Sequence, residues 1–312
     1  MTEGAKTKQV VDLFCGCGGL SKGFELAGFK IVGAFDKNAK ALSCYKKNFK
    51  HRVFDQDLSD TSEAIRIITE LNPGIIIGGP PCQDFSLAGK RIEGSRAFLT
   101  ICFAEIVKGV KPNFFVMENV AHAKKSNAYK VARDIFLEAG YRLTEQILDA
   151  SYYEVPQRRK RFLVVGHLEG ERGQFLLDKL IERASDSPST VKAMFPNFPV
   201  KYYYRHPRTY ERRAVFSIDE PAPTIRGVNR PRPKTYQAHA NDKSKSNNVR
   251  ALTYEERARI QTFPEGFVWP DDLGKSDLEQ MIGNAVPVNF AKNVGLTLLD
   301  YICEIEENNG RI

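Results

Sequence analysis

The feature that most constrains the fold is a strand, a glycine-rich turn and a helix near the start of the chain. Residues 10–14 (Val-Val-Asp-Leu-Phe) form a short apolar run that predicts a buried strand. Residues 15–19 (Cys-Gly-Cys-Gly-Gly) follow, and apolar residues then recur at helical spacing from Leu20 until Gly28 ends the segment. A strand, a glycine turn and a helix in this order are typical of the first unit of a nucleotide-binding α/β sheet.

The same alternation continues over the first 166 residues. Strands are expected near 31–35, 53–54, 75–77, 114–117, 142–149 and 162–166, and helices near 38–48, 61–71, 98–110 and 127–139. This order predicts an α/β fold with a doubly wound, mostly parallel sheet. Residues 184–250 are rich in Ser, Pro, Tyr, Arg and Asn, which indicates a second, smaller domain or a long excursion. Beyond it, Thr253 with Glu256 resembles a capping box that opens a helix to Phe263, and a last helix is expected from Phe290 to about Ile305.

Composition narrows the class of protein. The chain has 312 residues, 42% hydrophobic and 27% charged, which is typical of a soluble globular protein. We expect no membrane span, because no apolar run has the necessary length, and no signal peptide, because Met1 to Gln9 is polar. The six cysteines lack the paired spacing of a metal site, so we expect no metal and a reduced, cytoplasmic protein.

Positive charge is concentrated in one stretch. The net charge is +8, and residues 201–237 hold nine Lys or Arg against three acidic residues. A solvated basic surface would explain such a run, but here tyrosines are interleaved at positions 202, 203, 204, 210 and 236. Basic and aromatic residues in this mixture favour a nucleic acid partner.

Cys82 follows an abrupt strand end. The strand expected at 75–77 is stopped by Gly78, Gly79, Pro80 and Pro81. Because ligands bind at the carboxyl ends of strands in an open α/β sheet, a thiol here is well placed to act as a nucleophile. A small buried apolar residue is the alternative interpretation, and this stretch alone leaves both open.

Charged residues are expected at neighbouring strand ends. Asp36 ends a strand twenty residues after Gly16 and can accept hydrogen bonds from ribose hydroxyls. Asp57 follows the next strand and can accept from an adenine amino group. Glu118 follows four apolar residues and, if buried, could hydrogen-bond a nitrogen of a heterocycle. Arg159 and Arg161 are two residues apart, so in a strand their side chains would lie on the same face. The turn at 16–19 has Ser21 where the dinucleotide fingerprint has Gly or Ala, which leaves a nicotinamide cofactor or a nucleoside such as S-adenosylmethionine open.

Five motifs in order make the resemblance specific. They are Asp12-Leu13-Phe14-x-Gly16-x-Gly18-Gly19, Gly79-Pro80-Pro81-Cys82-Gln83, Glu118-Asn119-Val120, Gln157-x-Arg159-x-Arg161 and Gly283-Asn284-Ala285-Val286-Pro287. The chain resembles the DNA cytosine-5 methyltransferase family, in the compact form typical of bacterial restriction–modification systems. The match covers residues 9–168 and 250–298, and it leaves out the stretch where family members carry their target-recognition region.

The resemblance implies a catalytic set and a cofactor. Cys82 would be the nucleophile that adds to C6 of cytosine, and Glu118 would bind N3 and the exocyclic amine. Arg161, with Arg159 beside it, would contact O2 and the phosphates, and the Pro80 carbonyl would accept from the amine. The cofactor would be S-adenosyl-L-methionine, contacted by Phe14, Gly16, Gly18, Gly19, Asp36, Asp57, Leu99, Asn284 and Val286.

The resemblance also implies the partner and the domain organisation. The partner would be double-stranded DNA, with the cytosine flipped out and the loop from Gln83 to Arg96 closing over it. Thr224 followed by an aliphatic residue matches the family pattern. The DNA-binding candidates are Ser86, Arg96, Gln157, Thr224, Arg226, Asn229, Arg230 and Arg232. We expect a catalytic domain of residues 1–168 with 284–312 and an inserted target-recognition domain of 169–283. We also expect a monomer in the cytoplasm, associated with the nucleoid, with a restriction endonuclease as its genetic partner.

Two positions depart from the family pattern. Many relatives have Asp-Tyr-Gly where this chain has Tyr152-Tyr153-Glu154, which puts the local turn in doubt, and the ribose acid is Asp36 where Glu is common. A tRNA cytosine-5 methyltransferase is the nearest alternative function. That branch carries a Cys-Phe-Thr signature, whereas residues 170–300 contain no cysteine. A nicotinamide oxidoreductase leaves the later motifs unexplained, and the intact Cys82 and Glu118 argue against a non-catalytic DNA-binding relative.

Overall fold

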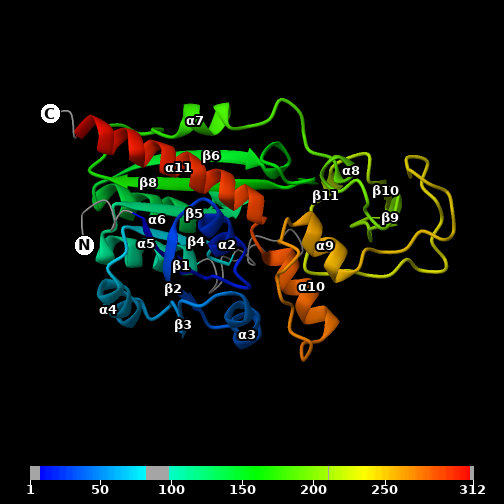
Figure 1. Cartoon of the computed structure of the whole chain (residues 1–312), viewed down its shortest axis with the longest axis horizontal. Coiled ribbons are helices and arrows are strands. Elements are labelled where there is room, and N and C mark those ends of the chain that lie inside the picture. The colour runs from blue at the N-terminus through cyan, green and yellow to red at the C-terminus, as the bar shows by residue number, and fades with distance from the viewer. Residues whose placement is uncertain (1–7, 82–97, 210, 310–312) are drawn as a thin grey trace.

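The centre of the molecule is a seven-stranded sheet. A computed structural model describes residues 8–81, 98–209 and 211–309. In spatial order, the strands are β3 (Arg52–Asp55), β2 (Lys30–Asp36), β1 (Gln9–Leu13), β4 (Ile75–Gly78), β5 (Phe114–Val120), β8 (Lys160–Leu168) and β6 (Tyr141–Asp149) (Figure 1). β8 runs antiparallel to both of its neighbours, and the other strand pairs are parallel. The expected doubly wound, mostly parallel sheet is therefore confirmed.

Helices cover both faces of this sheet because its strands alternate apolar side chains between the two. Ile75 and Ile77 of β4 enter one core, while Ile76 enters the other. The first face is covered by α2 (Gly19–Leu26), α7 (Leu177–Glu182) and α11 (Val288–Asn309). The opposite face is covered by α4 (Thr61–Leu71), α5 (Phe98–Val110) and α6 (Asn127–Glu138). Strands buried on both faces explain why the sequence shows continuous apolar runs.

The last helix lies directly against the first. A Cβ added to Gly23 of α2 would lie 2.3 Å from the Cβ of Ala291, and one added to Gly19 would lie 2.3 Å from the Val286 carbonyl oxygen. Glycine at both positions therefore lets the backbones of α2 and α11 approach closely. The residues just before α11 are in this way brought to the glycine turn after β1, as the resemblance implied.

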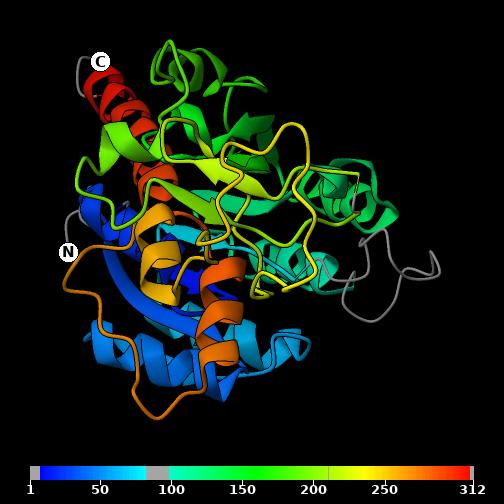
Figure 2. The same cartoon turned by 90° about the vertical axis from the view of Figure 1, so that its right-hand side faces the viewer.

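The basic segment, residues 185–250, extends beyond one end of the sheet (Figure 1) and faces the viewer in Figure 2. It contains α8 (Val191–Met194), a hairpin of β9 (Tyr202–Tyr204) with β10 (Val215–Ser217), and β11 (Ala222–Pro223), which pairs with β7 (Gln157–Arg158). Tyr203 and Tyr204 are each 1% exposed: Tyr204 packs in a small core within the segment, and Tyr203 packs in a larger core that the segment shares with other parts of the chain. The expectation that these two tyrosines serve a nucleic acid surface was wrong, because they form the interior of the segment.

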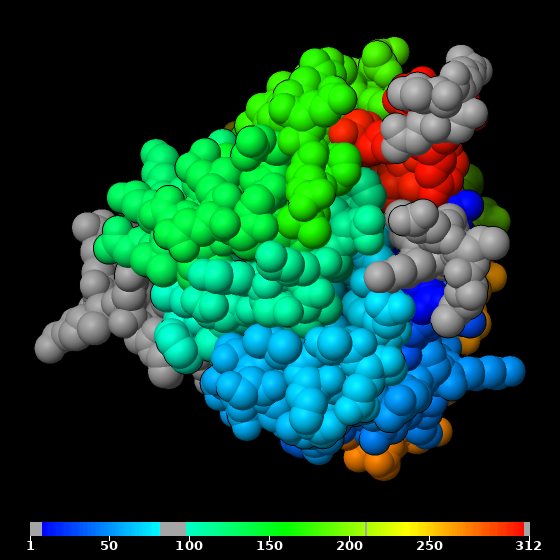
Figure 3. All heavy atoms as spheres, turned by 90° about the vertical axis from the view of Figure 1, so that its left-hand side faces the viewer, coloured from blue at the N-terminus to red at the C-terminus, as the bar shows by residue number. Residues whose placement is uncertain are grey.

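The boundary between the two parts differs from the expected one. Phe175, Leu176 and Leu180 belong to the core on the main sheet, so α7 packs there, although it lies within the range 169–283 expected for the inserted domain. At the other end, α9 (Tyr254–Ile260) and α10 (Lys275–Asn284) share a core with α3 (Ala39–Asn48) and with the basic segment. On the side opposite the basic segment, Figure 3 shows the cyan and green segments of the α/β part.

The sequence predicted the start of α9 correctly but placed its end too late. The capping box is present, with Thr253 accepting from the Glu256 N–H and the Glu256 carboxylate accepting from the Thr253 N–H. The helix ends at Ile260, before the expected Phe263, and Thr262 has a φ of 59°. α10 was not predicted from the sequence. Two short 3₁₀ turns, η2 (Ala121–Lys125) and η3 (Ala150–Tyr152), complete the elements of the described residues.

A buried polar chain joins β1, α2 and α3. The Ser21 hydroxyl lies 2.5 Å from the Asp12 carboxylate and 2.6 Å from the Tyr45 hydroxyl, which in turn lies 2.8 Å from His51 Nε2. Asp12 is completely buried, and this burial raises its pKa to about 7. Ser21, which departs from the dinucleotide fingerprint, is therefore a partner of Asp12.

In the part of the chain that the structure describes, no helix is long and apolar enough to cross a membrane.

Asp12 should make stability depend on pH. Between pH 4 and 7 the unfolded chain releases this proton while the folded protein keeps it, so stability falls as the pH rises, by on the order of 4 kcal/mol in all. Asn at this position still accepts from Ser21 but does not titrate. We therefore expect Asp12→Asn to be more stable than the wild type at pH 8 relative to its standing at pH 4, measured by urea unfolding. Asp134→Asn, at an exposed position on α6, is the control. Parallel curves for Asp12→Asn and the wild type would contradict the assignment.

Candidate active site

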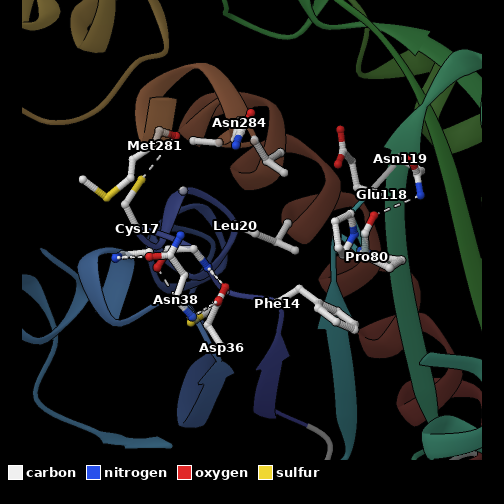
Figure 4. Close-up of a pocket in the computed structure, with 18 of the residues that line it drawn as sticks. Phe14, Cys17, Leu20, Asp36, Asn38, Pro80, Glu118, Asn119, Met281 and Asn284 are labelled. Carbon is white, nitrogen blue, oxygen red and sulfur yellow. Dashed lines mark hydrogen bonds between the residues drawn. The ribbon is translucent and has the colours of Figure 1, made fainter. Parts of the chain in front are cut away.

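A cavity of about 500 Å³ lies at the carboxyl ends of β1, β2, β4 and β5. The strand order reverses between β1 and β4, which is where open α/β sheets bind their ligands. Figure 4 shows Phe14, Leu20 and Asp36 on one side of this cavity, Pro80 and Glu118 on the other, and Asn284 above them. Every expected cofactor contact lines the cavity except Gly18, which lies between two lining residues. These contacts are Phe14, Gly16, Gly19, Asp36, Asp57, Leu99, Asn284 and Val286.

The glycine turn keeps its backbone open towards the cavity. Gly16 and Gly18 have φ values of 55° and 96°, in the left-handed region that glycine adopts without strain. A Cβ on Gly16 would meet no atom within 4 Å, whereas one on Gly18 would lie 2.3 Å from the Phe49 ring. Gly16 therefore leaves room for a ligand, and Gly18 serves the packing of α3 behind the turn.

Two carboxylates lie at the end of the cavity next to this turn. Asp36 accepts from the backbone N–H groups of Gly16 and Asn38, each at 2.8 Å, and burial raises its pKa despite these bonds. Asp57 is about half exposed, and hydrogen bonds from Ser59, with a further one from Lys37 at 3.1 Å, lower its pKa. The two acids give this end of the cavity hydrogen-bond acceptors and negative charge.

A second charged pair lies at the opposite end. The Arg161 Nε is 2.7 Å from the Glu118 Oε1, and both side chains are about 90% buried. Asn119 donates from its Nδ2 to the Pro80 carbonyl at 3.2 Å, which fixes the backbone just before position 82. Pro80, Glu118 and Arg161 thus come together as expected. Asn119 also lines the cavity and was not among the expected site residues, although it stands in the Glu-Asn-Val motif. Cys82, Ser86, Arg96 and the expected lid from Gln83 to Arg96 lie outside the described residues.

Arg159 lines the cavity and also holds two segments of the chain together. Its side chain is 2% exposed, with Nη1 donating to the Ile225 carbonyl at 3.0 Å and Nη2 donating to those of Gly283 at 3.1 Å and Ala285 at 3.0 Å. Burial, helped by the neighbouring Arg161, lowers its pKa. Both terminal nitrogens therefore hold the segment at Ile225 against the segment at 283–285, and the expected contact of Arg159 with a substrate phosphate stays a prediction.

A larger, basic cavity of about 1,600 Å³ adjoins the first. Ten Lys or Arg line it against four Asp or Glu, and Glu220 and Asp242 among these acids are bound by Arg213 and by backbone N–H groups. Arg161 and Asn284 line both cavities, so the two cavities meet beside the ion pair of Arg161 with Glu118. Such an excess of positive charge is suited to the phosphates of a nucleic acid.

The structure changes the list of DNA-binding candidates. Thr224 and Arg226 line the basic cavity. Gln157 is completely buried with its amide bound inside the protein, and the Asn229 amide donates to the Leu252 carbonyl and to Glu279, so their expected base contacts are corrected to structural ones. Arg230 and Arg232 are not among the lining residues, and Arg232 donates to the Ser246 carbonyl. The lining arginines that were not expected are Arg158, Arg205, Arg208, Arg212 and Arg213, and the basic run at 201–237 was the signal for the last four.

Comparisons with known proteins agree with this geometry. The family model described as C-5 cytosine-specific DNA methylase matches residues 8–300. The Type II methyltransferase M.HindV of Haemophilus influenzae is 52% identical over 295 residues, which cover 93% of this chain and 96% of that protein. M.HgiDI of Herpetosiphon aurantiacus, also a Type II methyltransferase, is 48% identical over 296 residues, covering 94% and 95%. The crystal structure of S. pombe Dnmt2 methyltransferase has a TM-score of 0.69 at 19% identity, covers 94% of this chain and 98% of that one, and shows a shared fold. The chain therefore belongs to the C-5 cytosine-specific DNA methylase family and is a DNA cytosine-5 methyltransferase of the compact bacterial kind.

Proposed function

We propose that the enzyme transfers a methyl group from S-adenosyl-L-methionine to C5 of a flipped-out cytosine in a short, specific duplex sequence. We further propose a covalent bond between Cys82 and C6, and a role as the modification enzyme of a restriction–modification system. One observation carries the proposal: the cavity that ends in Asp36 and Asp57 meets the basic cavity at Arg161, which is paired with Glu118. A cofactor and a nucleic acid base can therefore reach one point from opposite sides.

The described residues fit S-adenosylmethionine better than a dinucleotide. Asp36 and Asp57 offer acceptors for ribose hydroxyls and an adenine amine, and Phe14 and Leu99 offer apolar surface. A dinucleotide needs its pyrophosphate at the N-terminus of the first helix. Here the Val286 carbonyl oxygen occupies that approach, 2.3 Å from where a Cβ of Gly19 would lie, and it would repel a phosphate. The nicotinamide alternative is disfavoured for this reason.

The chemistry requires attack by the protein before methyl transfer, because C5 of an aromatic cytosine is a poor nucleophile. The Cys82 thiolate adds to C6 and breaks the aromaticity, while Glu118 holds N3 and the exocyclic amine and Arg161 stabilises the charge that develops at O2. The Pro80 carbonyl, oriented by Asn119, accepts from the amine. The bound cofactor supplies the methyl group as an electrophile. Loss of the C5 proton and departure of the Cys82 sulfur then restore the ring as 5-methylcytosine.

The basic cavity supports duplex DNA as the substrate. C5 and C6 cannot be reached inside a stacked duplex, so the cytosine must leave the helix. Arg208 and Arg212 are exposed side chains in the lining and suit phosphates, while Thr224 and Arg226 in the same lining are partly buried. RNA methylation is the second candidate. The likeness to Dnmt2 concerns the fold, and residues 170–300 lack the cysteine signature of the RNA branch.

Further parts of the proposal concern organisation. We propose a monomer in the cytoplasm, associated with the nucleoid, with a cognate restriction endonuclease as a genetic partner. The target-recognition part is proposed to begin after α7, because Phe175, Leu176 and Leu180 pack on the main sheet. Bisulfite sequencing of a host that expresses the gene would identify the methylated sequence.

Trapping of the covalent complex tests the reaction. We expect wild-type protein, S-adenosylmethionine and a duplex carrying 5-fluorocytosine at the target site to accumulate a stable adduct, because fluorine at C5 cannot leave as a proton does. Cys82→Ser should form none and should lose methylation by at least about 10³-fold, measured by denaturing electrophoresis and methyl incorporation. If Cys82→Ser methylates normally, the mechanism is wrong. If an RNA carrying 5-fluorocytidine is trapped and the duplex is not, the substrate is wrong.

Glu118→Gln tests the second catalytic group. Glutamine keeps the shape but loses the charge that faces both Arg161 and the cytosine, so we expect kcat to fall by about 10²–10⁴-fold with little change in cofactor affinity. Glu145→Gln is the matched control, since Glu145 is also mostly buried and ion-paired, with Arg133 at 3.1 Å, but lies away from both cavities. Equal losses in the two variants would show a general effect on the fold.

A further inference from the structure

Gln261, which no motif singled out, occupies a central position between the two cavities. It is completely buried just after α9 and lines neither cavity. Its Nε2 donates to the carbonyls of Ile282 at 2.5 Å and Ala285 at 3.1 Å, and its Oε1 accepts from Gln157 Nε2 at 2.8 Å. Gln261 therefore holds the turn between α10 and α11 and also binds a residue of β7.

Gln157 continues this connection to the basic segment. Its Oε1 accepts from the Ile225 N–H at 2.8 Å, next to the pairing of β7 with β11. Ile225 stands between Thr224 and Arg226, which line the basic cavity. At the other end of the connection, Ala285 stands between Asn284 and Val286, which line the cofactor cavity. Two buried amides thus join a DNA-facing segment to a cofactor-facing one.

Arg159 bridges the same two segments directly. It donates to the Ile225 carbonyl on one side and to the Gly283 and Ala285 carbonyls on the other. Steric contact reinforces the bridge, because a Cβ on Gly283 would lie 2.1 Å from the Gly227 nitrogen. Backbones in such close contact, joined by buried polar groups that have no water to replace a lost partner, cannot shift independently at low cost.

We propose that Gln157, Arg159 and Gln261 form a buried link that couples binding of the cofactor to binding of the DNA. This inference rests on the proposed function, because it assigns the two cavities to those two ligands. Gln261 touches neither ligand in this scheme and is a positioning residue. By linkage, whatever factor the duplex adds to cofactor affinity, the cofactor must add to duplex affinity.

Binding measurements on the whole protein test the link. The probes are S-adenosylhomocysteine and a duplex that carries the methylated site, each titrated alone and in the presence of the other. For the wild type we expect each probe to tighten the other by the same factor, at least about fivefold. For Gln261→Met, which removes both donations and the acceptor, we expect this factor to fall towards 1 while each probe alone binds within about threefold of the wild type. The single-turnover rate constant of the saturated ternary complex should change less than the KM values for the cofactor and for the DNA.

The matched control is Asn293→Leu. Asn293 is also a buried amide, and it donates to the Tyr153 and Asn289 carbonyls, but it does not join the two segments. We expect it to lower stability and to keep the coupling factor. Gln261→Glu is a second variant, which keeps the acceptor for Gln157 but places a carboxylate oxygen against the Ile282 and Ala285 carbonyls, so it should also lower the factor.

The outcomes separate the two proposals. No methylation and no trapped adduct from the wild type would overturn the proposed function itself. A methylating wild type that shows no coupling, or folded Gln261 variants that keep the wild-type factor, would overturn the link alone. An equal loss of coupling in Asn293→Leu would also overturn it, because the loss would then follow from general destabilisation.

Discussion

The close approach of α11 to α2 is the constraint on which the site depends. Glycine at positions 19 and 23 lets the start of α11 lie on the first helix, and the turn before α11 then carries Asn284 and Val286 to the end of β1. A larger side chain at either glycine would push this turn away from the sheet. Without this contact the cavity would lack the wall that Asn284 and Val286 form. These two residues are more than 250 positions away in the sequence from the end of β1.

Local patterns predicted much of this structure. The bounds of α4 and α5 were expected to the residue, and the alternating strands and helices gave the correct sheet class, because these features depend on neighbouring residues. The fates of Gln157, Asn229 and Tyr203 were not predictable in the same way. The buried amide of Gln157 is hydrogen-bonded by Gln261, 104 residues later in the sequence. The residues around Gln157 in the sequence do not predict that contact. Polar residues in a basic stretch read alike from the sequence whether they face DNA or hold the chain together.

Glu154 shows how distant contacts can replace a local rule. Many relatives have glycine there, and the residue adopts a φ of 55°, a conformation that costs a side chain roughly 1 kcal/mol or more. The Asn289 Nδ2 donates to the Glu154 carbonyl, and Asn293 and Lys292 contact its carboxylate. The turn is therefore kept by α11 rather than by a glycine. The doubt raised by this departure is resolved through the same helix that closes the cavity.

The distribution of charge explains why the two cavities meet where they do. In the proposed reaction the cofactor is a cation and enters the cavity that holds Asp36 and Asp57, while the DNA is an anion and enters the cavity lined by an excess of arginine and lysine. Basic residues around the cofactor would repel its positive charge, and acidic residues around the DNA would repel its phosphates. Glu118 and Arg161 lie at the junction, where each neutralises the other at 2.7 Å until a base arrives. In the proposed reaction the cytosine offers its amine N–H to the Glu118 carboxylate and its O2 to the Arg161 guanidinium, so both members can bind the base while the buried pair stays together.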